Sequence, residues 1–575
     1  MLWRPTWPRS PPRWRAPPAS APATTDSTSS VVAPTATEPP DDPEPLVTSP
    51  ATEAARRRTF AIISHPDAGK TTLTEKFLLY GGALSGGAGA VKARGDRRSA
   101  TSDWMEMEQQ RGISITSTVL QFPYRDCVVN LLDTPGHRDF SEDTYRVLAA
   151  ADAAVMVLDA AKGIEPQTLK LFEVCKARQM PLLTFINKWD RPGLEALELL
   201  DEIDAKIGVT AAPVTWPVGI AGDFRGVIDR AGGGRFVRFT RTARGATEAP
   251  EEIVDAERAE AEEGAAWTAA VEESALLETM GLDFDNELFL GGELSPTFFG
   301  SALTNFGVRL LLDAVIDLAP AASARPDRDG NLRPLDAPFS GFVFKVQANM
   351  DKAHRDRIAF LRVCSGRFER GMVVTHSETG KPFATKYAHQ VFGSDRETVE
   401  EAYPGDVVGL VNATDVRVGD TLWIDEAVTF PRIPSFAPEF FSVARVRDTG
   451  RFKQFRKGIA QLDEEGVVQV LRDPDLGDQA PVLAAVGPMQ FDVAVHRLET
   501  EFGAPVELSP TTYSVARRTD AASTPTLRAM RGVDVLNRSD GTLIAVFESQ
   551  YWLERLVAEQ PELVLEPLVA GDHPT

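Results

Sequence analysis

One nine-residue stretch, from Ser64 to Thr72, constrains the fold of this chain more than any other. It reads Ser-His-Pro-Asp-Ala-Gly-Lys-Thr-Thr, and an apolar run over residues 60–63 precedes it. Apolar residues at helical spacing follow, so the order is a strand, a glycine turn and a helix. In that setting backbone N–H groups converge on anionic oxygens. The stretch therefore predicts a phosphate-binding loop, although Ser64 stands where the strict pattern has glycine.

The residues of this loop are candidate ligands of a nucleotide. Lys70 is placed to reach the β- and γ-phosphates, and the Thr71 hydroxyl is placed to ligate Mg²⁺. An ordinary strand-to-helix turn with a surface lysine would look similar, so the motif needs support from elsewhere in the chain. The candidates are Ser64, His65, Asp67, Ala68, Gly69, Lys70, Thr71 and Thr72.

Two further segments predict the rest of the phosphate end. The apolar run 128–132 ends in Asp133, where a carboxylate beside a phosphate loop can hold Mg²⁺ through water. The Gly136 N–H can meet a γ-phosphate, and His137 follows it. A hydroxyl at Ser114, on the preceding loop, can complete a Mg²⁺ shell. Each pattern also occurs in ordinary turns and solvated loops, so their order along the chain carries the argument.

Residues 187–190, Asn-Lys-Trp-Asp, follow another buried-strand pattern and predict a base-binding loop. The Asp190 carboxylate can accept hydrogen bonds from N1–H and the N2 amino group of guanine, whereas adenine offers no such donor pair. The stem of Lys188 can lie along the ring, and Asn187 can tie this loop to the phosphate loop. Because these motifs follow successive strands, they predict a GTP-binding α/β domain with ligands at the carboxyl ends of its strands.

A last base-contacting loop is predicted at Ser301, Ala302 and Leu303, where the Ala302 N–H is expected to meet guanine O6. Together with Arg111-Gly112-Ile113, these motifs resemble those of the translational GTPases. Within that group the chain resembles the bacterial peptide chain release factor 3 family, and the match extends from about residue 58 to about residue 516. The segments and residues that carry this finer resemblance are 102–108, Ser114, 215–217, 284–290 and 296–300.

The resemblance implies a GTPase that converts GTP and water to GDP and phosphate on the ribosome during translation termination. It implies that the protein promotes dissociation of a class-one release factor after peptide release. His137, assisted by Lys70 and Gly136, would orient the attacking water. Elongation factors carry threonine where Ser114 stands, so Mg²⁺ coordination there rests on a smaller hydroxyl. The expected partners are GTP or GDP, ribosomal RNA and proteins, and class-one release factors, for a cytoplasmic monomer with Mg²⁺ as its cofactor.

Two other functions stay open on the sequence alone. A translocase-like factor would share every nucleotide motif, but such factors carry further domains that the residues after Ala516 are too few to supply. A GTP-regulated binding module with vestigial hydrolysis is the second alternative. Intact Lys70, Thr71, Asp133 and His137 argue against it.

The charge of the chain argues against a general attraction to nucleic acid. Its formal net charge is −22, and 15 acidic residues against one arginine lie between Glu248 and Glu293. Because the acidity is largely one local feature, ribosomal RNA stays open as a partner for other faces. The three cysteines lie far apart, which favours a reducing compartment over a disulfide framework. No apolar run reaches the roughly 18 residues of a membrane-spanning helix, so no membrane partner is expected.

The sequence predicts five segments. The Pro-, Ala-, Ser- and Thr-rich N-terminus reads as a disordered tail or as translated sequence upstream of the true start. Strands punctuated by glycine predict a β-barrel, and a strand-helix-strand-strand-helix-strand order predicts a ferredoxin-like α+β domain. The expected boundaries are 1–55 for the tail, 56–325 for the GTP-binding domain with a subdomain inserted at about 216–297, 338–430 for the barrel, 436–520 for the ferredoxin-like domain and 521–575 for a C-terminal extension.

A cluster of cations in the ferredoxin-like domain is the best candidate for a surface that faces RNA. An ordinary solvated helix face explains it equally well. For the acidic insertion, a solvated helix is favoured over a docking surface. The cations are Arg445, Arg447, Arg451, Lys453, Arg456 and Lys457.

Overall fold

The computed structural model describes most of the chain after the N-terminal tail. The predicted Mg²⁺ ligand Ser114 and the segment Arg111-Gly112-Ile113 lie outside the described residues. Within the described part, no helix is both long and apolar enough to cross a membrane. The described residues are 48–83, 117–242, 247–348, 357–392, 395–413, 416–433, 437–474 and 477–568.

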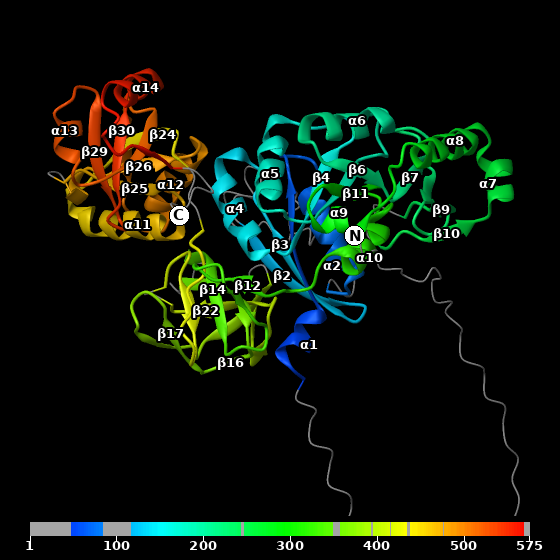
Figure 1. Cartoon of the computed structure of the whole chain (residues 1–575), viewed down its shortest axis with the longest axis horizontal. Coiled ribbons are helices and arrows are strands. Elements are labelled where there is room, and N and C mark those ends of the chain that lie inside the picture. Colours follow the sequence, from blue (N-terminus) through cyan, green and yellow to red (C-terminus); the bar gives the residue numbers. More distant parts are fainter. Residues whose placement is uncertain are drawn as a thin grey trace, which may run out of the picture. The chain divides into compact units, whose positions relative to one another are not determined.

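The first domain is built on a seven-stranded sheet with the order β2-β3-β1-β4-β5-β11-β6 (Figure 1). Every neighbouring pair is parallel except β2 and β3. The predicted α/β fold is therefore confirmed. The strands are β1 (Arg57–Ser64), β2 (Thr118–Tyr124), β3 (Cys127–Asp133), β4 (Ala153–Asp159), β5 (Leu182–Asn187), β6 (Thr210–Pro213) and β11 (Leu294–Phe299). The helices are α2 (Lys70–Tyr80), α4 (Ser141–Ala150), α5 (Pro166–Ala177), α6 (Ala196–Ile207) and α10 (Val308–Leu318), with a 3₁₀ turn η1 (Arg138–Phe140) before α4.

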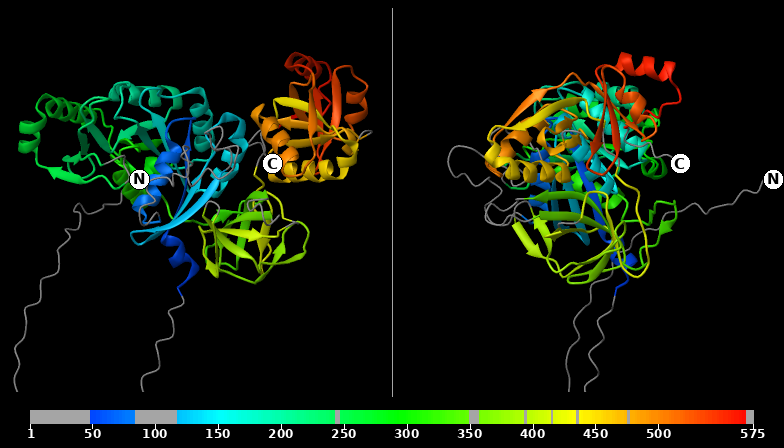
Figure 2. Two further views of the ribbon diagram at one scale, coloured as in Figure 1. Left: turned by 180° about the vertical axis from the view of Figure 1, so that it is seen from behind. Right: turned by 90° about the vertical axis from the view of Figure 1, so that its left-hand side faces the viewer.

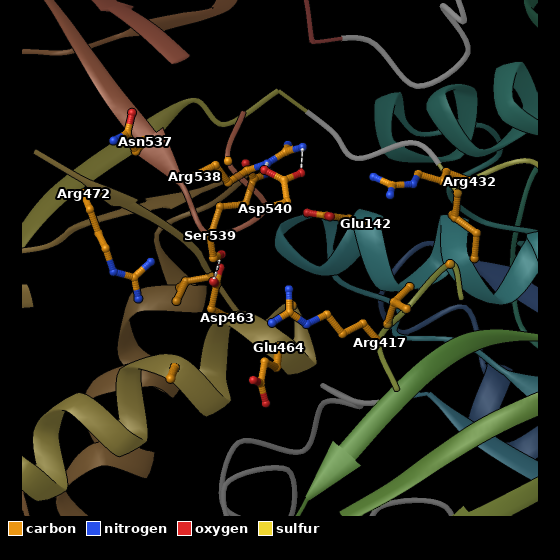
Figure 3. Close-up of a pocket in the computed structure, with 18 of the residues that line it drawn as sticks. Glu142, Arg417, Arg432, Asp463, Glu464, Arg472, Asn537, Arg538, Ser539 and Asp540 are labelled. Carbon is orange, nitrogen blue, oxygen red and sulfur yellow. Dashed lines mark hydrogen bonds and ion pairs between the residues drawn. The ribbon is translucent and has the colours of Figure 1, made fainter. Parts of the chain in front are cut away.

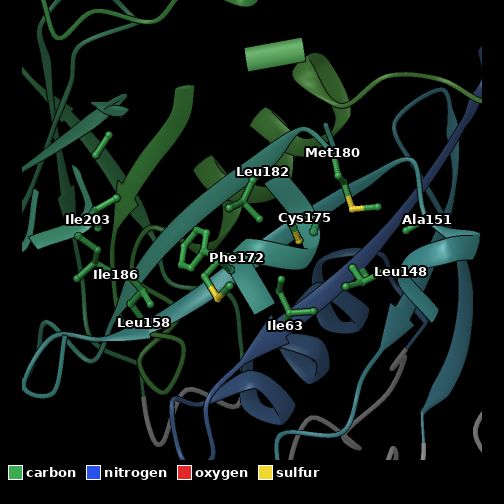
Figure 4. Close-up of a cluster of buried hydrophobic side chains, with 14 of the residues drawn as sticks. Ile63, Leu148, Ala151, Leu158, Phe172, Cys175, Met180, Leu182, Ile186 and Ile203 are labelled. Carbon is green, nitrogen blue, oxygen red and sulfur yellow. The ribbon is translucent and has the colours of Figure 1, made fainter. Parts of the chain in front are cut away.

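Helices cover both faces of this sheet because its central strands are apolar on both sides. Side chains of β1 alternate: Phe60 and Ile62 join the core under α2 and α10, whereas Ala61 and Ile63 join the core under α4, α5 and α6. Figure 4 shows the second of these cores, where Ile63 lies among side chains of β4, β5 and the covering helices. The sheet is thereby fixed, and its strand ends can hold loops in place.

A small subdomain is inserted between β6 and β11. It is a four-stranded antiparallel sheet with the order β10-β9-β8-β7, accompanied by helices that carry the acidic stretch. Arginines of the sheet pair with those acids: Arg238 lies 2.6 Å from Glu262 and 2.7 Å from Glu263. The elements are β7 (Thr215–Val218), β8 (Gly226–Asp229), β9 (Arg235–Phe239), β10 (Glu251–Val254), α7 (Ala256–Glu263), α8 (Ala265–Thr279) and α9 (Asn286–Leu290).

The second domain is an antiparallel barrel with its own apolar core. Its main sheet has the order β18-β17-β23-β14-β15-β22-β19-β20, and β16 pairs with β21. The predicted barrel is confirmed. The strands are β14 (Ser340–Ala348), β15 (Arg357–Ser365), β16 (Phe368–Glu369), β17 (Val373–His376), β18 (Pro382–Ala384), β19 (Ala388–Phe392), β20 (Asp395–Thr398), β21 (Glu401–Ala402), β22 (Val407–Val411) and β23 (Thr421–Trp423), after a short hairpin of β12 (Arg325–Pro326) and β13 (Leu332–Arg333).

The last domain begins with the predicted strand-helix-strand-strand-helix-strand order. Both helices pack on one face of its sheet, the gold and orange helices of Figure 2. The residues expected to form a C-terminal extension add strands to the same antiparallel sheet, whose order is β27-β24-β26-β25-β29-β30-β28-β31. The sheet therefore continues past residue 520, because β29 pairs with β25. The elements are β24 (Phe440–Val446), η3 (Thr449–Arg451), α11 (Phe452–Glu465), β25 (Gln469–Arg472), η4 (Gly477–Gln479), β26 (Val482–Ala485), α12 (Met489–Thr500), β27 (Val506–Pro510), β28 (Val515–Thr519), α13 (Thr524–Arg528), β29 (Val533–Arg538), β30 (Leu543–Phe547), α14 (Gln550–Glu559) and β31 (Glu566–Pro567).

The predicted boundary of the N-terminal tail is wrong by a few residues. A helix, α1 (Pro50–Ala55), precedes β1, with the Ser49 side chain as its N-cap and Pro50 in its first turn. Glu53 pairs with Arg57 at 2.7 Å, and Ala54 is fully buried. These contacts order residues that composition alone assigns to the tail.

Candidate nucleotide-binding site

The phosphate-binding loop connects β1 to α2 as predicted. Gly69 is the N-cap residue of α2 and adopts φ of 98°, a left-handed conformation that glycine tolerates. A side chain there would also collide with Asn187, whose Nδ2 lies 2.3 Å from the position of a Cβ. The turn thus needs glycine for its conformation and for space. The N–H groups in the first turn of α2 lie at the N-terminal end of the helix, where they can meet an anion.

A lysine and an acid meet beside this loop. Lys70 Nζ donates to Asp133 Oδ1 at 2.6 Å, and both side chains are almost fully buried. They meet because β1 and β3 are parallel neighbours, so that the loops after them leave the sheet at the same edge. Thr134 Oγ1 donates to the Ile62 carbonyl at 2.7 Å and holds the second loop against β1.

Asn187 joins the three loops of the base-binding end. Its Nδ2 donates to the Ala68 carbonyl at 2.7 Å, which confirms the predicted tie to the phosphate loop. Its Oδ1 accepts from the Ala302 N–H at 2.8 Å. The contact of the Ala302 N–H with guanine O6 stays a prediction; within the chain this N–H is bound by the Asn187 amide, which holds Ala302 beside the base loop. Ser301 and Leu303 flank Ala302, and Leu303 is half exposed.

Lys188 and Asp190 present the polar groups of the base loop. Lys188 adopts φ of 67°, and its ammonium donates to the Asp67 carbonyl and to Asp159 Oδ2, the latter at 2.8 Å. The Oδ1 atom of Asp190 is buried and has no hydrogen-bond partner within the described part of the chain. Because an unpaired buried acceptor is costly, this oxygen is suited to a ligand that brings its own donor. The N1–H and N2 groups of guanine are such donors.

His65 contributes to the loop through both its ring and its backbone carbonyl. Its ring is buried and contacts the Pro66 carbonyl and Glu165, with Nδ1 2.7 Å from Glu165 Oε2. Burial lowers the pKa of His65, and the nearby carboxylate of Glu165 opposes that shift only in part. The lowered pKa favours the neutral imidazole at pH 7. Ser64, also buried, donates its hydroxyl to the His65 carbonyl at 2.8 Å.

His137 stands at the phosphate end, immediately after Gly136. The position of a Cβ on Gly136 lies 3.7 Å from Pro66 Cα, so the two loops are close neighbours. The His137 ring is partly exposed; its Nδ1 accepts from the Asp139 N–H at 3.3 Å, and the ring meets Phe140 edge-on.

Comparisons with known proteins place these motifs in a family. Residues 55–321 match the Elongation factor Tu GTP binding domain, residues 338–424 match Elongation factor G domain 2, and residues 430–557 match the Class II release factor RF3, C-terminal domain. A protein of Microcystis aeruginosa named Peptide chain release factor 3 is 50% identical over 90% of this chain and 96% of its own. Its namesake in Gloeobacter violaceus is 52% identical over 89% of this chain and 97% of its own. This chain belongs to the peptide chain release factor 3 family.

The fold agrees with this membership. A crystal structure of a protein from Thermus thermophilus matches 85% of this chain and 72% of its own, with a TM-score of 0.63 and 23% sequence identity. The peptide chain release factor 3 family is one of GTPases in translation termination. The family model of the C-terminal domain reaches residue 557, so the resemblance extends beyond its predicted end near Ala516.

The oxygen donors at the phosphate end fit the Mg²⁺ that a GTPase domain of this family uses. Thr71 supplies a hydroxyl in the first turn of α2, and Asp133, 2% exposed, supplies a carboxylate. These are hard oxygen ligands of the kind Mg²⁺ prefers. No three His, Cys, Asp or Glu side chains gather into a metal cage among the described residues. One or two protein oxygens together with nucleotide phosphates is the usual arrangement for this ion.

Asp139 is a residue near the site that sequence reasoning missed. Its carboxylate, buried in η1, accepts from the Met489 N–H at the start of α12 at 2.7 Å. Next to it, Phe140 packs on Val493 of the same helix. The segment that carries His137 is thus attached to the last domain of this release factor 3 family member. No spacing in the sequence links residues that lie 350 positions apart.

A hollow of about 1160 Å³ lies away from the nucleotide site. It is lined by charged side chains of α4, the barrel and the last domain, and by none of the predicted nucleotide ligands (Figure 3). Several of its polar side chains contact each other: Arg538 lies 2.6 Å from Asp540, and the Ser539 hydroxyl donates to Asp463. Asn537, which also lines the hollow, has a buried Oδ1 atom with no hydrogen-bond partner among the described residues.

Proposed function

We propose that this protein hydrolyses GTP to GDP and phosphate on the ribosome, and that its nucleotide state promotes dissociation of a class-one release factor after peptide release. The proposed binding of GTP rests on three loops that meet at one edge of the sheet. The buried Asp190 Oδ1 lies in one of these loops and has no hydrogen-bond partner among the described residues. The names of the relatives support the ribosomal part.

The phosphates would bind at the start of α2. Backbone N–H groups after Gly69 and the Lys70 ammonium surround the position of the β- and γ-phosphates, and Lys70 exchanges part of its contact with Asp133 for phosphate oxygens. Thr71, Asp133 and Ser114 would hold Mg²⁺. When bound, this ion offsets the negative charge of the phosphates.

His137 would orient the water that attacks the γ-phosphorus. Its Nδ1 accepts from the Asp139 N–H, which leaves Nε2 as the ring nitrogen that can contact the water. For the ring to reach the attacking water it must turn toward the γ-phosphate, which the Gly136 N–H would contact. Docking on the ribosome would favour that orientation, so the free protein should bind GTP but hydrolyse it slowly. The loops around Ser114 and Gly136 would be ordered by the γ-phosphate and released by hydrolysis.

The protein would act as a cytoplasmic monomer. Its partners would be GTP or GDP, ribosomal RNA and proteins, and class-one release factors. A translocase-like role would use the same nucleotide chemistry, and a test of release-factor dissociation separates the two roles. Vestigial hydrolysis is excluded if ribosomes stimulate phosphate release.

The experiment is single-turnover release of γ-phosphate with and without ribosomes, for the wild type and His137→Ala. The variant should keep GTP affinity within about threefold and lose about 100-fold or more of ribosome-stimulated hydrolysis, because the ring no longer orients water. Intrinsic hydrolysis should change much less. His496→Ala, a half-buried histidine of α12, is the matched control. Full ribosomal stimulation in His137→Ala would remove His137 from the proposed role.

A further inference from the structure

Six cations form one exposed surface on the last domain, which we call the basic surface. All six side chains are exposed. Only one acid, Asp448, interrupts them in a chain whose formal net charge is −22. The basic surface consists of Arg445, Arg447, Arg451, Lys453, Arg456 and Lys457.

The fold gathers these cations from a strand, a 3₁₀ turn and a helix. Arg445 and Arg447 lie two positions apart at the end of β24, so they share a face. Lys453, Arg456 and Lys457 lie at i, i+3 and i+4 on α11 and share a helix face. The opposite side of α11 is apolar and buried in the core of the domain through Phe455, Ile459 and Leu462.

The basic surface is almost free of ion pairs. Among the described residues only Arg456 has a carboxylate within ion-pair distance, that of Asp478 at 3.9 Å. Glu507 lies opposite Arg445 in the strand register, and the Asp448 side chain accepts from the Gly450 N–H at 2.9 Å. Buried or half-buried arginines elsewhere are paired: Arg57 with Asp406, Arg238 with Glu263, Arg362 with Asp152.

We infer that the basic surface binds phosphate groups of ribosomal RNA. This inference rests on the proposed function for the presence of the ribosome. Unpaired guanidinium and ammonium groups on neighbouring turns suit a polyanion whose charges repeat at short intervals, and arginine binds phosphate through two parallel hydrogen bonds.

An acidic protein is the less favoured partner. Protein interfaces bury a core of aromatic and aliphatic side chains. Among the described residues, none of the large apolar side chains that are exposed lies between Phe440 and Glu465. The surface therefore offers charge without an apolar centre, as an RNA-binding face does.

The basic surface lies apart from the ion pairs that α11 makes with the barrel and with α12. It occupies the N-terminal end of α11, whereas Glu464 and Glu465 at the other end pair with Arg357 and Arg497 at 2.6 and 2.8 Å. A helix of 14 residues is about 21 Å long. RNA can bind at one end without competing for the pairs at the other.

The test compares three variants of the full chain. One neutralises the surface by Arg447→Gln, Lys453→Gln and Lys457→Gln. The second keeps its charge by Arg447→Lys, Lys453→Arg and Lys457→Arg. The third removes the same charge from exposed positions elsewhere by Lys381→Gln, Lys386→Gln and Arg531→Gln. Binding is measured to protein-free 16S and 23S ribosomal RNA and to intact ribosomes over a range of salt, with GTP affinity and thermal unfolding as checks on the fold.

The neutralised variant should lose about tenfold or more in affinity for both probes, and its salt dependence should be less steep by about two units, because fewer counterions are released. The other two variants should bind as the wild type does, and GTP affinity should not change. If the wild type binds ribosomal RNA but ribosomes do not stimulate its GTP hydrolysis, the proposed function fails and the inference stands. Undiminished binding by the neutralised variant, loss on ribosomes but not on RNA, or no RNA binding by the wild type would each overturn it.

Discussion

At the scale of single residues, we propose that Asp190 decides the base specificity of the site. Its Oδ1 is buried without a partner among the described residues, whereas Asn187 beside it is fully engaged with the neighbouring loops. Asn187 thus positions the base loop, and the Asp190 carboxylate is available for the proposed contact with the base.

Asp190→Asn should lower GTP affinity by about 100-fold, or about 3 kcal/mol, because a charge-assisted pair of hydrogen bonds in a desolvated pocket is lost. The variant should gain affinity for xanthosine triphosphate, since an amide can donate to the C2 oxygen of xanthine. Titration calorimetry with both nucleotides measures the effect, and Asp204→Asn, an exposed acid of α6, is the control. Unchanged GTP affinity would remove Asp190 from base recognition.

Motifs with a local mechanism could be predicted residue by residue. Lys70 and Asp133 are brought together because each ends or follows a parallel strand, and Asn187 reaches Ala68 as expected. The hydrogen bond between the Ala302 N–H and the Asn187 amide could not be predicted, because it joins two loops that no spacing in the sequence links. The contact of Asp139 could not be predicted for the same reason, because its partner Met489 belongs to another domain.

At the scale of elements, the start of α12 depends on a residue outside its own domain. Pro488 precedes the helix and gives no side-chain cap, so the Asp139 carboxylate accepts from the first N–H. A carboxylate at a helix N-terminus is also favoured by the helix dipole. This contact joins the segment that carries His137 to α12.

Asp139→Ala should therefore loosen the first turn of α12. Amide hydrogen exchange in residues 489–492 should become faster, by an amount that corresponds to about 1–2 kcal/mol, because a capping acceptor is lost. Exchange in α11 should change less. The control is Glu499→Ala, an exposed acid at the other end of α12. Equal exchange rates in Asp139→Ala and the wild type would mean that Asp139 does not stabilise the helix start.

The composition of the N-terminus predicts the same stability for two truncations, whereas the helix α1 predicts different stabilities. Removing residues 1–47 should leave the thermal midpoint unchanged, whereas removing residues 1–55 should lower it, because the Glu53–Arg57 pair and the buried Ala54 are lost. Arg57 lowers the pKa of Glu53 below its ordinary value through a hydrogen bond. The stabilisation by Glu53 is thus present at neutral pH and is lost as pH falls through this lowered pKa.

Differential scanning calorimetry of both truncations at pH 7 and at acidic pH measures this difference. The Glu53→Gln variant of the full chain isolates the charge from the rest of the helix. Identical midpoints for the two truncations at pH 7 would show that α1 does not contribute to stability.

For the whole molecule, the three predicted domain types are all present: an α/β domain, an antiparallel barrel and an α+β domain. Their patterns are periodic and local, and so a single sequence reveals them. The extent of the last sheet was not predictable, because β25 pairs with β29 across more than 60 residues of chain and only tertiary packing makes that choice. The helix α1 was hidden by a composition typical of disorder.

The proposed role of the whole molecule predicts that the protein speeds the dissociation of a class-one release factor from the ribosome. Ribosomes that have released their peptide and still hold a fluorescently labelled class-one release factor are mixed with this protein and GTP, and the rate of label dissociation is followed. The protein should accelerate dissociation with GTP and not with GDP, and the Asp190→Asn variant should lose the effect at the same GTP concentration. Dissociation at the same rate with and without the wild-type protein would contradict the proposed function, whatever its rate of GTP hydrolysis.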